Sequence, residues 1–103
     1  MTRFTAPEPF AINVPEAVLT DLRERLSRVR WPGEVPETSW DYGANLAYMK
    51  DLIEYWRTQY DWRAQERQIN RWKHFRTTID GQSIHFIHER GKGPKPFPLI
   101  VSH

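Results

Sequence analysis

Several features that carry chemistry or targeting in other proteins are missing from this 103-residue chain. It contains no cysteine, which excludes a disulfide framework, a thiol nucleophile and a cysteine metal site, and which suits a reducing compartment. No apolar stretch approaches the ~20 residues that a membrane-spanning helix needs, and residues 1–9 lack the apolar core of a secretory signal. We therefore expect a soluble, cytoplasmic protein with no membrane partner.

Neither sign of charge dominates the sequence. The chain has 15 Lys and Arg against 13 Asp and Glu, and the two signs are interleaved. Nucleic-acid binding normally needs a concentrated basic patch, so we expect no nucleic-acid partner. The segment 71–76 mixes cations with rings, as surfaces that stack single strands do. It fits better as a helix end with Trp72 and Phe75 facing inward.

The apolar residues, 39% of the chain, are enough for one small globular domain. They recur at helical spacing after Pro15, which is well placed to open a helix. That helix should end near Arg30, because Trp31-Pro32-Gly33 breaks helical hydrogen bonding. Its solvated face carries two pairs of opposite charge at i,i+4 spacing, Asp21 with Arg25 and Glu24 with Arg28.

Two further helices are predicted downstream. Apolar residues repeat at helical spacing over residues 45–60, and Asp61 should cap a third helix that reaches about Lys73. The irregular link before residue 45 has a tryptophan at each end, Trp31 and Trp40. We expect both rings to be buried and to pin the link to the core.

Alternating apolar residues predict extended structure in the rest of the chain. Residues 75–79 and 84–88 flank Asp80-Gly81, a pair that supplies the positive backbone angles of a tight hairpin turn. Residues 10–14 alternate in the same way and predict an extended arm with one apolar edge. A flexible loop then leads to a continuous apolar strand at 98–101.

A strand such as Leu99-Ile100-Val101 needs neighbours for its backbone groups and suits a sheet covered on both faces. No later strand follows it in this sequence. We therefore expect these 103 residues to be the front section of a larger protein.

The candidates for chemistry are few. His85 and His88 fall on opposite faces of a strand and should not share a metal ion, and His74 should lie alone and half exposed. No serine sits in a Gly-Xaa-Ser-Xaa-Gly elbow, and the aspartates fit caps, turns or helix faces. His103 is the exception, because it directly follows a buried strand, where open α/β sheets place their ligand crevice.

Several segments, taken in this order, carry a family resemblance. They are Pro9-Phe10-Ala11-Ile12-Asn13-Val14-Pro15, Arg30-Trp31-Pro32, Trp40-Asp41-Tyr42-Gly43, Tyr60-Asp61-Trp62-Arg63, and the hairpin Phe75-Arg76-Thr77-Thr78-Ile79-Asp80-Gly81 with Ile84-His85-Phe86-Ile87-His88. Together they resemble the N-terminal region of epoxide hydrolases of the microsomal type, within the α/β-hydrolase superfamily.

The resemblance implies an α+β fragment. Residues 1–73 would form an N-terminal helical meander that packs around the catalytic domain. Residues 74–103 would start the α/β-hydrolase core, with the hairpin and a truncated third strand at Leu99–Val101. The family continues His-Gly-Xaa-Pro at this point, so His103 matches only the first residue. Backbone amides just beyond it help to stabilise an oxyanion, which makes His103 oxyanion-proximal.

The parent enzyme implied by the resemblance hydrolyses an epoxide in two steps. A carboxylate attacks an epoxide carbon, and water activated by a histidine then cleaves the ester. These groups, and two lid tyrosines, would all lie after residue 103. We therefore expect no catalytic residue, no cofactor, no metal and no turnover in this chain alone. Microsomal members also carry a membrane anchor before the matched region, and residues 1–9 contain none, which favours a soluble enzyme.

Two hypotheses stay open. In the first, the chain is a structural region whose partner is the α/β-hydrolase core of the same protein, and a small-molecule epoxide binds only to the whole enzyme. In the second, it is a stand-alone, non-catalytic interaction module. An uncovered apolar strand edge tends to recruit a partner, so this module would oligomerise or pair through Phe97–Val101.

Overall fold

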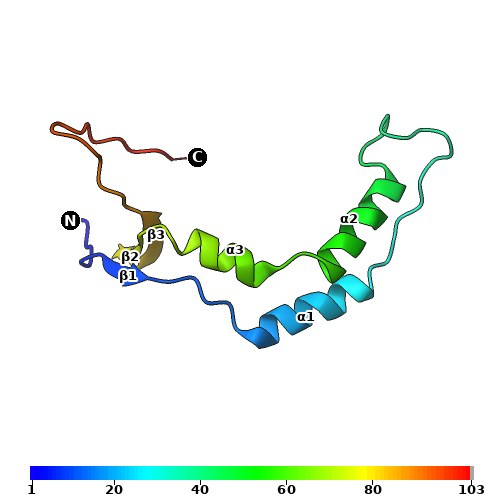
Figure 1. Ribbon diagram of the computed structural model, residues 1–103, viewed down its shortest axis with the longest axis horizontal. Coiled ribbons are helices and arrows are strands. Elements are labelled where there is room, and N and C mark those ends of the chain that lie inside the picture. The colour runs from blue at the N-terminus through cyan, green and yellow to red at the C-terminus, as the bar shows by residue number, and fades with distance from the viewer. Residues whose placement is uncertain (103) are drawn as a thin grey trace. The chain divides into compact units, whose positions relative to one another are not determined.

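The computed structural model describes residues 1–102, which contain helices and a small antiparallel sheet (Figure 1). The elements, in chain order, are β1 (Glu8–Phe10), α1 (Glu16–Ser27), α2 (Leu46–Thr58), α3 (Trp62–Ile69), β2 (His74–Ile79) and β3 (Gln82–Ile87). The chain divides into a helical unit, residues 13–64, and a sheet unit, residues 1–12 with the chain from Gln65 onward. No helix within residues 1–102 has the length and apolar character needed to cross a membrane. The predicted division into a meander (1–73) and the start of a hydrolase core (74–103) concerns a longer protein and stays a prediction.

Helix α1 forms where the sequence predicts it. The Pro15 carbonyl accepts hydrogen bonds from the amides of Val18 and Leu19, which begins the helix. The helix ends at Ser27, slightly before the predicted end, and the Ser27 hydroxyl donates to the Glu24 carbonyl. Such a side-chain bond competes with the helical ladder. Both predicted ion pairs are present, Arg25 with Asp21 and Arg28 with Glu24.

Side chains cap the starts of the other two helices, as predicted for Asp61. Asn45 Oδ1 accepts a hydrogen bond of 2.9 Å from the Tyr48 amide, and Asp61 Oδ1 accepts one of 3.0 Å from the Ala64 amide. Each cap satisfies an amide that the first helical turn leaves unpaired. Helix α3 ends at Ile69 rather than near Lys73.

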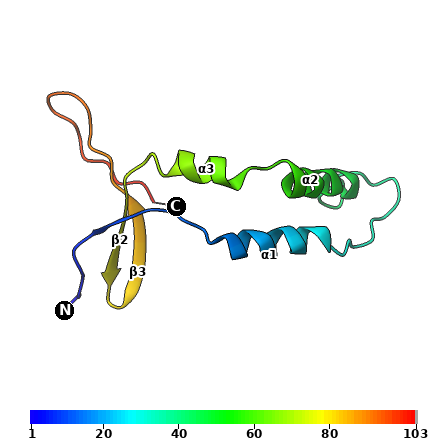
Figure 2. The same cartoon turned by 60° about the horizontal axis from the view of Figure 1, so that its bottom comes forward.

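Residues 74–87 form the predicted hairpin (Figure 2). The turn residues Asp80 and Gly81 have φ values of 46° and 84°, the left-handed angles that a tight two-residue turn requires. Strands β2 and β3 pair antiparallel with Phe75 opposite Phe86, whose ring centroids lie 5.7 Å apart. The prediction of a hairpin at Asp80-Gly81 is confirmed.

The N-terminal arm joins the sheet through its backbone. Strand β1 pairs with β2, with Phe10 opposite His74, so the strand order is β1-β2-β3. Beyond β1, Asn70 continues the pairing with its side chain. Its Nδ2 donates to the Ile12 carbonyl at 2.7 Å, and its Oδ1 accepts from the Ile12 amide at 2.8 Å. One amide side chain thus does what a neighbouring strand would do for Ile12.

The expected third strand is not formed in this chain. Residues 98–102 have no strand pairing, and Leu99, Ile100 and Val101 are exposed, Ile100 by 94%. The physical reason is that a strand gains its hydrogen bonds only from a neighbour, and none of the described strands lies beside this segment. His103, predicted to lie near an oxyanion site, falls outside the described residues.

Two tryptophans are more exposed than the sequence predicts. Trp40 is 55% and Trp72 is 57% exposed, whereas Trp31 and Phe75 are half-buried as expected. Leu19, which is 5% exposed, is the one apolar residue within 1–102 that is buried. A unit of about 50 residues has too little mass to enclose several rings of this size.

The arm anchor gives a first test. Asn70→Ala removes both bonds to Ile12, which should weaken the local structure by about 1–3 kcal/mol. Hydrogen exchange of the Ile12 amide should accelerate by about 5- to 150-fold, the equivalent ratio. Asn13→Ala makes the same chemical change at an exposed neighbouring position and should leave that exchange unchanged. Equal Ile12 exchange in both variants would contradict the anchor.

Glu16 gives a second test. Its carboxylate accepts hydrogen bonds from Arg63 at 3.0 Å and from Arg23 at 3.1 Å, which lower the pKa of Glu16. A lowered folded pKa means that the stabilisation is present above the unfolded value and is lost as pH falls through the folded value. Arg63→Ala should raise the Glu16 titration midpoint in a carbon-13 NMR titration, and more than Arg23→Ala does. High salt should reduce the effect because the pair is exposed. An unmoved midpoint in Arg63→Ala would be the contrary result.

Candidate functional site

The helical unit carries an open apolar groove along α1 and α2, which lie side by side (Figure 2). The groove has a volume of about 590 Å³. Apolar residues recur every three or four positions along each helix, so they share one face. The residues of this apolar groove are Val14, Val18, Leu19, Leu22, Leu52, Tyr55, Trp56, Tyr60 and Trp62.

Most of the apolar groove is open to solvent. Val18 is 53% and Tyr55 is 48% exposed, and Leu52, Trp56 and Tyr60 are similar. Full burial of a large apolar side chain contributes about 1.5–3 kcal/mol, so covering each half-exposed side chain would contribute about 1 kcal/mol. Contiguous apolar surface of this kind marks an interaction site.

The total exposed surface leads to the same conclusion. The chain exposes 9646 Å² and has a mass of 12.4 kDa. Two separate compact domains, each of half that mass, would together expose about 7,400 Å². The excess of about 2,200 Å² is comparable with what one partner buries in a large obligate interface. The surface is therefore suited to being covered by another body.

The opposite face of α2 is solvated. Arg57 donates two hydrogen bonds to Glu54, at 2.6 Å and 3.0 Å, and both side chains are exposed. These bonds lower the pKa of the Glu54 carboxyl. Residues 54 and 57 lie away from the helical face that carries Leu52 and Trp56. Helix α2 thus separates a charged side from an apolar side, as a helix at an interface does.

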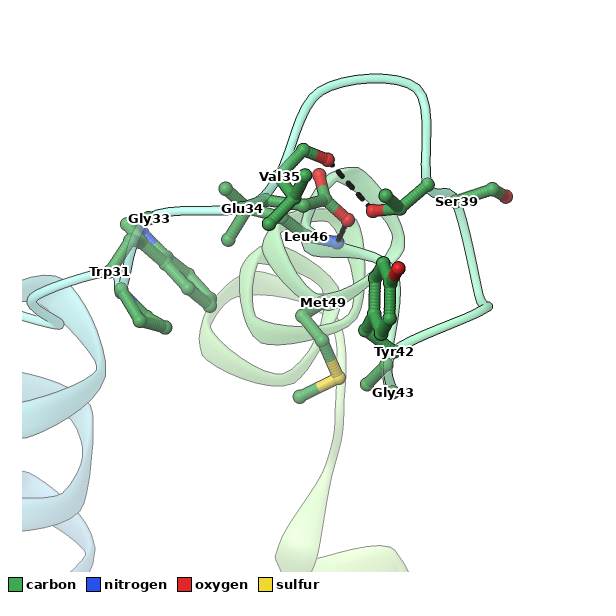
Figure 3. Close-up of a pocket in the computed structure, with 12 residues that line it drawn as sticks. Trp31, Gly33, Glu34, Val35, Ser39, Tyr42, Gly43, Leu46 and Met49 are labelled. Atoms are coloured by element: carbon green, nitrogen blue, oxygen red, sulfur yellow. Dashed lines mark hydrogen bonds between the residues drawn. The ribbon is translucent and has the colours of Figure 1, made fainter.

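The loop between α1 and α2 forms a cup of about 370 Å³ (Figure 3). Trp31 and Tyr42 lie on opposite sides of it, with Met49 between them. Glu34, one of the lining residues, has a carboxylate, a type of group that often acts in catalysis. That carboxylate accepts a hydrogen bond of 3.0 Å from the Leu46 amide. A carboxylate at the start of a helix pairs with an otherwise unpaired amide and interacts favourably with the positive end of the helix dipole. Glu34 therefore has a structural role at the start of α2.

The histidines differ from the prediction in one respect. His74 was expected alone and half exposed, which is wrong: it is 4% exposed and its Nδ1 lies 2.9 Å from His85 Nε2. His85 lies opposite Arg76 in the ladder. Alternate residues of a strand share a face, so residue 74 lies on the same face as residue 76 and therefore as His85. The alternating pattern of the predicted hairpin could have indicated this pair. His88 packs near Phe75 on the other face, as predicted. The part of the chain that the structure describes contains no group of three potential metal ligands.

Three of the five aspartates have a hydrogen-bond partner that explains them. Asp21 pairs with Arg25, Asp61 caps α3, and Asp80 Oδ1 accepts a hydrogen bond of 2.7 Å from the Arg3 amide. These contacts match the predicted roles in pairs, caps and turns. Each is a structural use of the carboxylate rather than the arrangement of a nucleophile beside a base.

The chain matches the family described as "Epoxide hydrolase N terminus" over residues 7–103. It is 45% identical over 95 residues to a protein of Stigmatella aurantiaca whose name assigns it provisionally to the epoxide hydrolases, covering 92% of this chain and 22% of that protein. It is 34% identical over 98 residues to epoxide hydrolase 1 of Oryctolagus cuniculus, covering 89% of this chain and 22% of the relative. The chain thus spans about a fifth of the length of these relatives.

Solved structures of epoxide hydrolases are similar to this chain. The crystal structure of juvenile hormone epoxide hydrolase from the silkworm Bombyx mori superimposes with a TM-score of 0.80 at 30% identity, over 88% of this chain and 22% of that one. The Aspergillus niger epoxide hydrolase superimposes with a TM-score of 0.74 at 28% identity, over 81% of this chain and 22% of that one. The chain belongs to the epoxide hydrolase N-terminus family, within the epoxide hydrolases of the α/β-hydrolase superfamily.

Proposed function

We propose that this chain is the N-terminal, non-catalytic part of an epoxide hydrolase and that its apolar groove packs against the catalytic α/β-hydrolase core of the same protein. One observation carries this proposal: a folded helical unit leaves most of its apolar groove exposed. This chain covers only 22% of each of these relatives, which supports a covering body made of the remaining chain. The lack of cysteine supports a cytoplasmic location as part of the proposal.

The chemistry of the whole enzyme would lie in that core. A carboxylate oxygen would attack an epoxide carbon and form an ester while the ring C–O bond at that carbon breaks. The ring oxygen would stay bound to the neighbouring carbon and become a hydroxyl group by taking a proton from an acidic group such as a lid tyrosine. A water molecule deprotonated by a histidine would then cleave the ester, releasing a vicinal diol and restoring the carboxylate. This chain would contribute by holding the core in shape, with no catalytic residue, cofactor or metal of its own.

Substitutions within α2 test whether the apolar groove packs against the core. They are made in the longest natural protein that carries this chain. Leu52→Lys puts a charge in the apolar groove, where docking would bury it without a partner. We expect the free energy of unfolding to fall by about 1–3 kcal/mol and the yield of enzyme active on styrene oxide to fall with it.

Asp51→Lys is the matched control, because it places the same side chain at an exposed neighbouring position of α2 outside the apolar groove. It should leave stability and turnover close to those of the parent protein. Equal behaviour of the two variants would contradict docking through the groove. A folded parent protein that leaves both aromatic and alkyl epoxides intact would contradict the activity itself.

The exposed end of the chain favours a second candidate function, a non-catalytic module that self-associates. Phe97, Leu99, Ile100 and Val101 are all at least 83% exposed, and apolar segments of this kind tend to recruit a partner. This candidate predicts a stable oligomer of the 103-residue chain in light scattering, dispersed by Ile100→Lys. A monomer at high concentration would count against it.

A further inference from the structure

Buried His74 and exposed His85 form a pair that ties helix α3 to the sheet. His74 Nδ1 lies 2.9 Å from His85 Nε2, and His74 Nε2 lies 2.8 Å from the carbonyl oxygen of Ile69, the last residue of α3. The two ring planes differ by 13°. One imidazole therefore satisfies a carbonyl at the helix end and contacts a neighbouring strand.

These distances restrict where the ring protons can be. A carbonyl oxygen only accepts hydrogen bonds, so His74 Nε2 must carry a proton. The bond between the two rings needs one proton, on His74 Nδ1 or on His85 Nε2. When both rings are neutral, that proton is on His85 Nε2, and His85 Nδ1 is left without one. A first added proton can occupy His85 Nδ1 without breaking either bond.

A second added proton cannot be accommodated in this way. With both rings charged, His74 Nδ1 and His85 Nε2 both carry protons, and two N–H groups face each other across 2.9 Å. The pair must then separate, and His74 gives up its contact with the neighbouring strand. The geometry therefore accepts the neutral and singly charged forms and rejects the doubly charged form.

Charged groups of both signs lie on the elements around the pair. Glu66 is buried one turn before Ile69, and the negative end of α3 also favours one nearby cation. Arg76 is paired with His85 in the ladder, and its positive charge disfavours a second positive charge on the histidine pair. Glu8 on β1 is paired with Arg76 from the other side and offsets part of that charge. The other charged groups on or beside these elements are Arg67 in α3, Lys73 before β2, and His88 and Glu89 after β3.

We propose that the His74–His85 pair is a proton-limited latch, closed with at most one charge and opened by the second proton. The open form binds one proton more than the closed form. By linkage, the ratio of closed to open should fall by up to about tenfold for each pH unit over which the second proton is bound. This inference does not depend on the proposed packing of the apolar groove against a catalytic core.

Ring-nitrogen NMR of the longest natural protein that carries this chain, with nitrogen-15 histidine, tests the latch. At about pH 8, the neutral side of the histidine range, His74 should carry its proton on Nε2, and a scalar coupling should join His74 Nδ1 to His85 Nε2. As pH falls, the pair should take up one proton with the coupling intact and lose the coupling with the second. Two fully charged rings with the coupling still present, or His74 lacking a proton on Nε2 at about pH 8, would overturn the proposal.

Two variants separate the latch from general acid sensitivity. His85→Gln keeps an N–H donor for His74 Nδ1 but cannot be charged, so hydrogen-exchange protection of β2 should no longer fall with acid beyond its intrinsic pH dependence. His88→Gln removes an exposed histidine and should retain the full acid response. Retention of that response in His85→Gln would also overturn the latch, and the titration of the unsubstituted protein decides the matter independently if His85→Gln does not fold.

Discussion

Most of the apolar surface that could stabilise this chain by burial is not covered by its own residues. Leu19 is the one buried apolar residue among those described, while the rest of the apolar groove stays largely open. Local structure forms without a large core because each helix and turn also has polar support. Burial by a second body would supply the larger part of the stabilisation.

Within this chain, hydrogen bonds from polar side chains stabilise the helices and the sheet, a role that a hydrophobic core has in larger domains. Asn45 and Asp61 cap helices, Asn70 pairs with Ile12 like a strand, and His74 holds the last carbonyl of α3. Each contact joins a side chain to the backbone; three of them lie within five residues in the sequence, and the contact of Asn70 spans 58 residues. This explains how well-defined elements coexist with an exposed apolar face.

The elements most visible in the sequence are those that local chemistry determines. Asp80-Gly81 predicts its turn because few residues adopt positive φ, and Asp61 predicts its helix through a single cap. The exposure of Trp40 and the absence of a strand at Leu99–Val101 could not be predicted in this way, since both depend on which surfaces lie nearby. The same holds for His74, whose burial requires the strand register and the end of α3 together.

Family membership was also accessible from the sequence, because the order of several short segments carries it. The apolar groove was visible only as two amphipathic stripes, one on each helix. That the stripes form one open face required the packing of α1 beside α2. Sequence periodicity indicates which side of a helix is apolar, but it does not say whether the same chain covers that side.

The most direct test of the account compares hydrogen exchange of α1 and α2 in the isolated 103-residue chain with that in the longest natural protein containing it. If a catalytic core covers the apolar groove, the amides of both helices should exchange far more slowly in the longer protein, while the Asp80-Gly81 turn changes less. Equal protection of α1 and α2 in the two proteins would contradict the central claim that this surface is built to be covered.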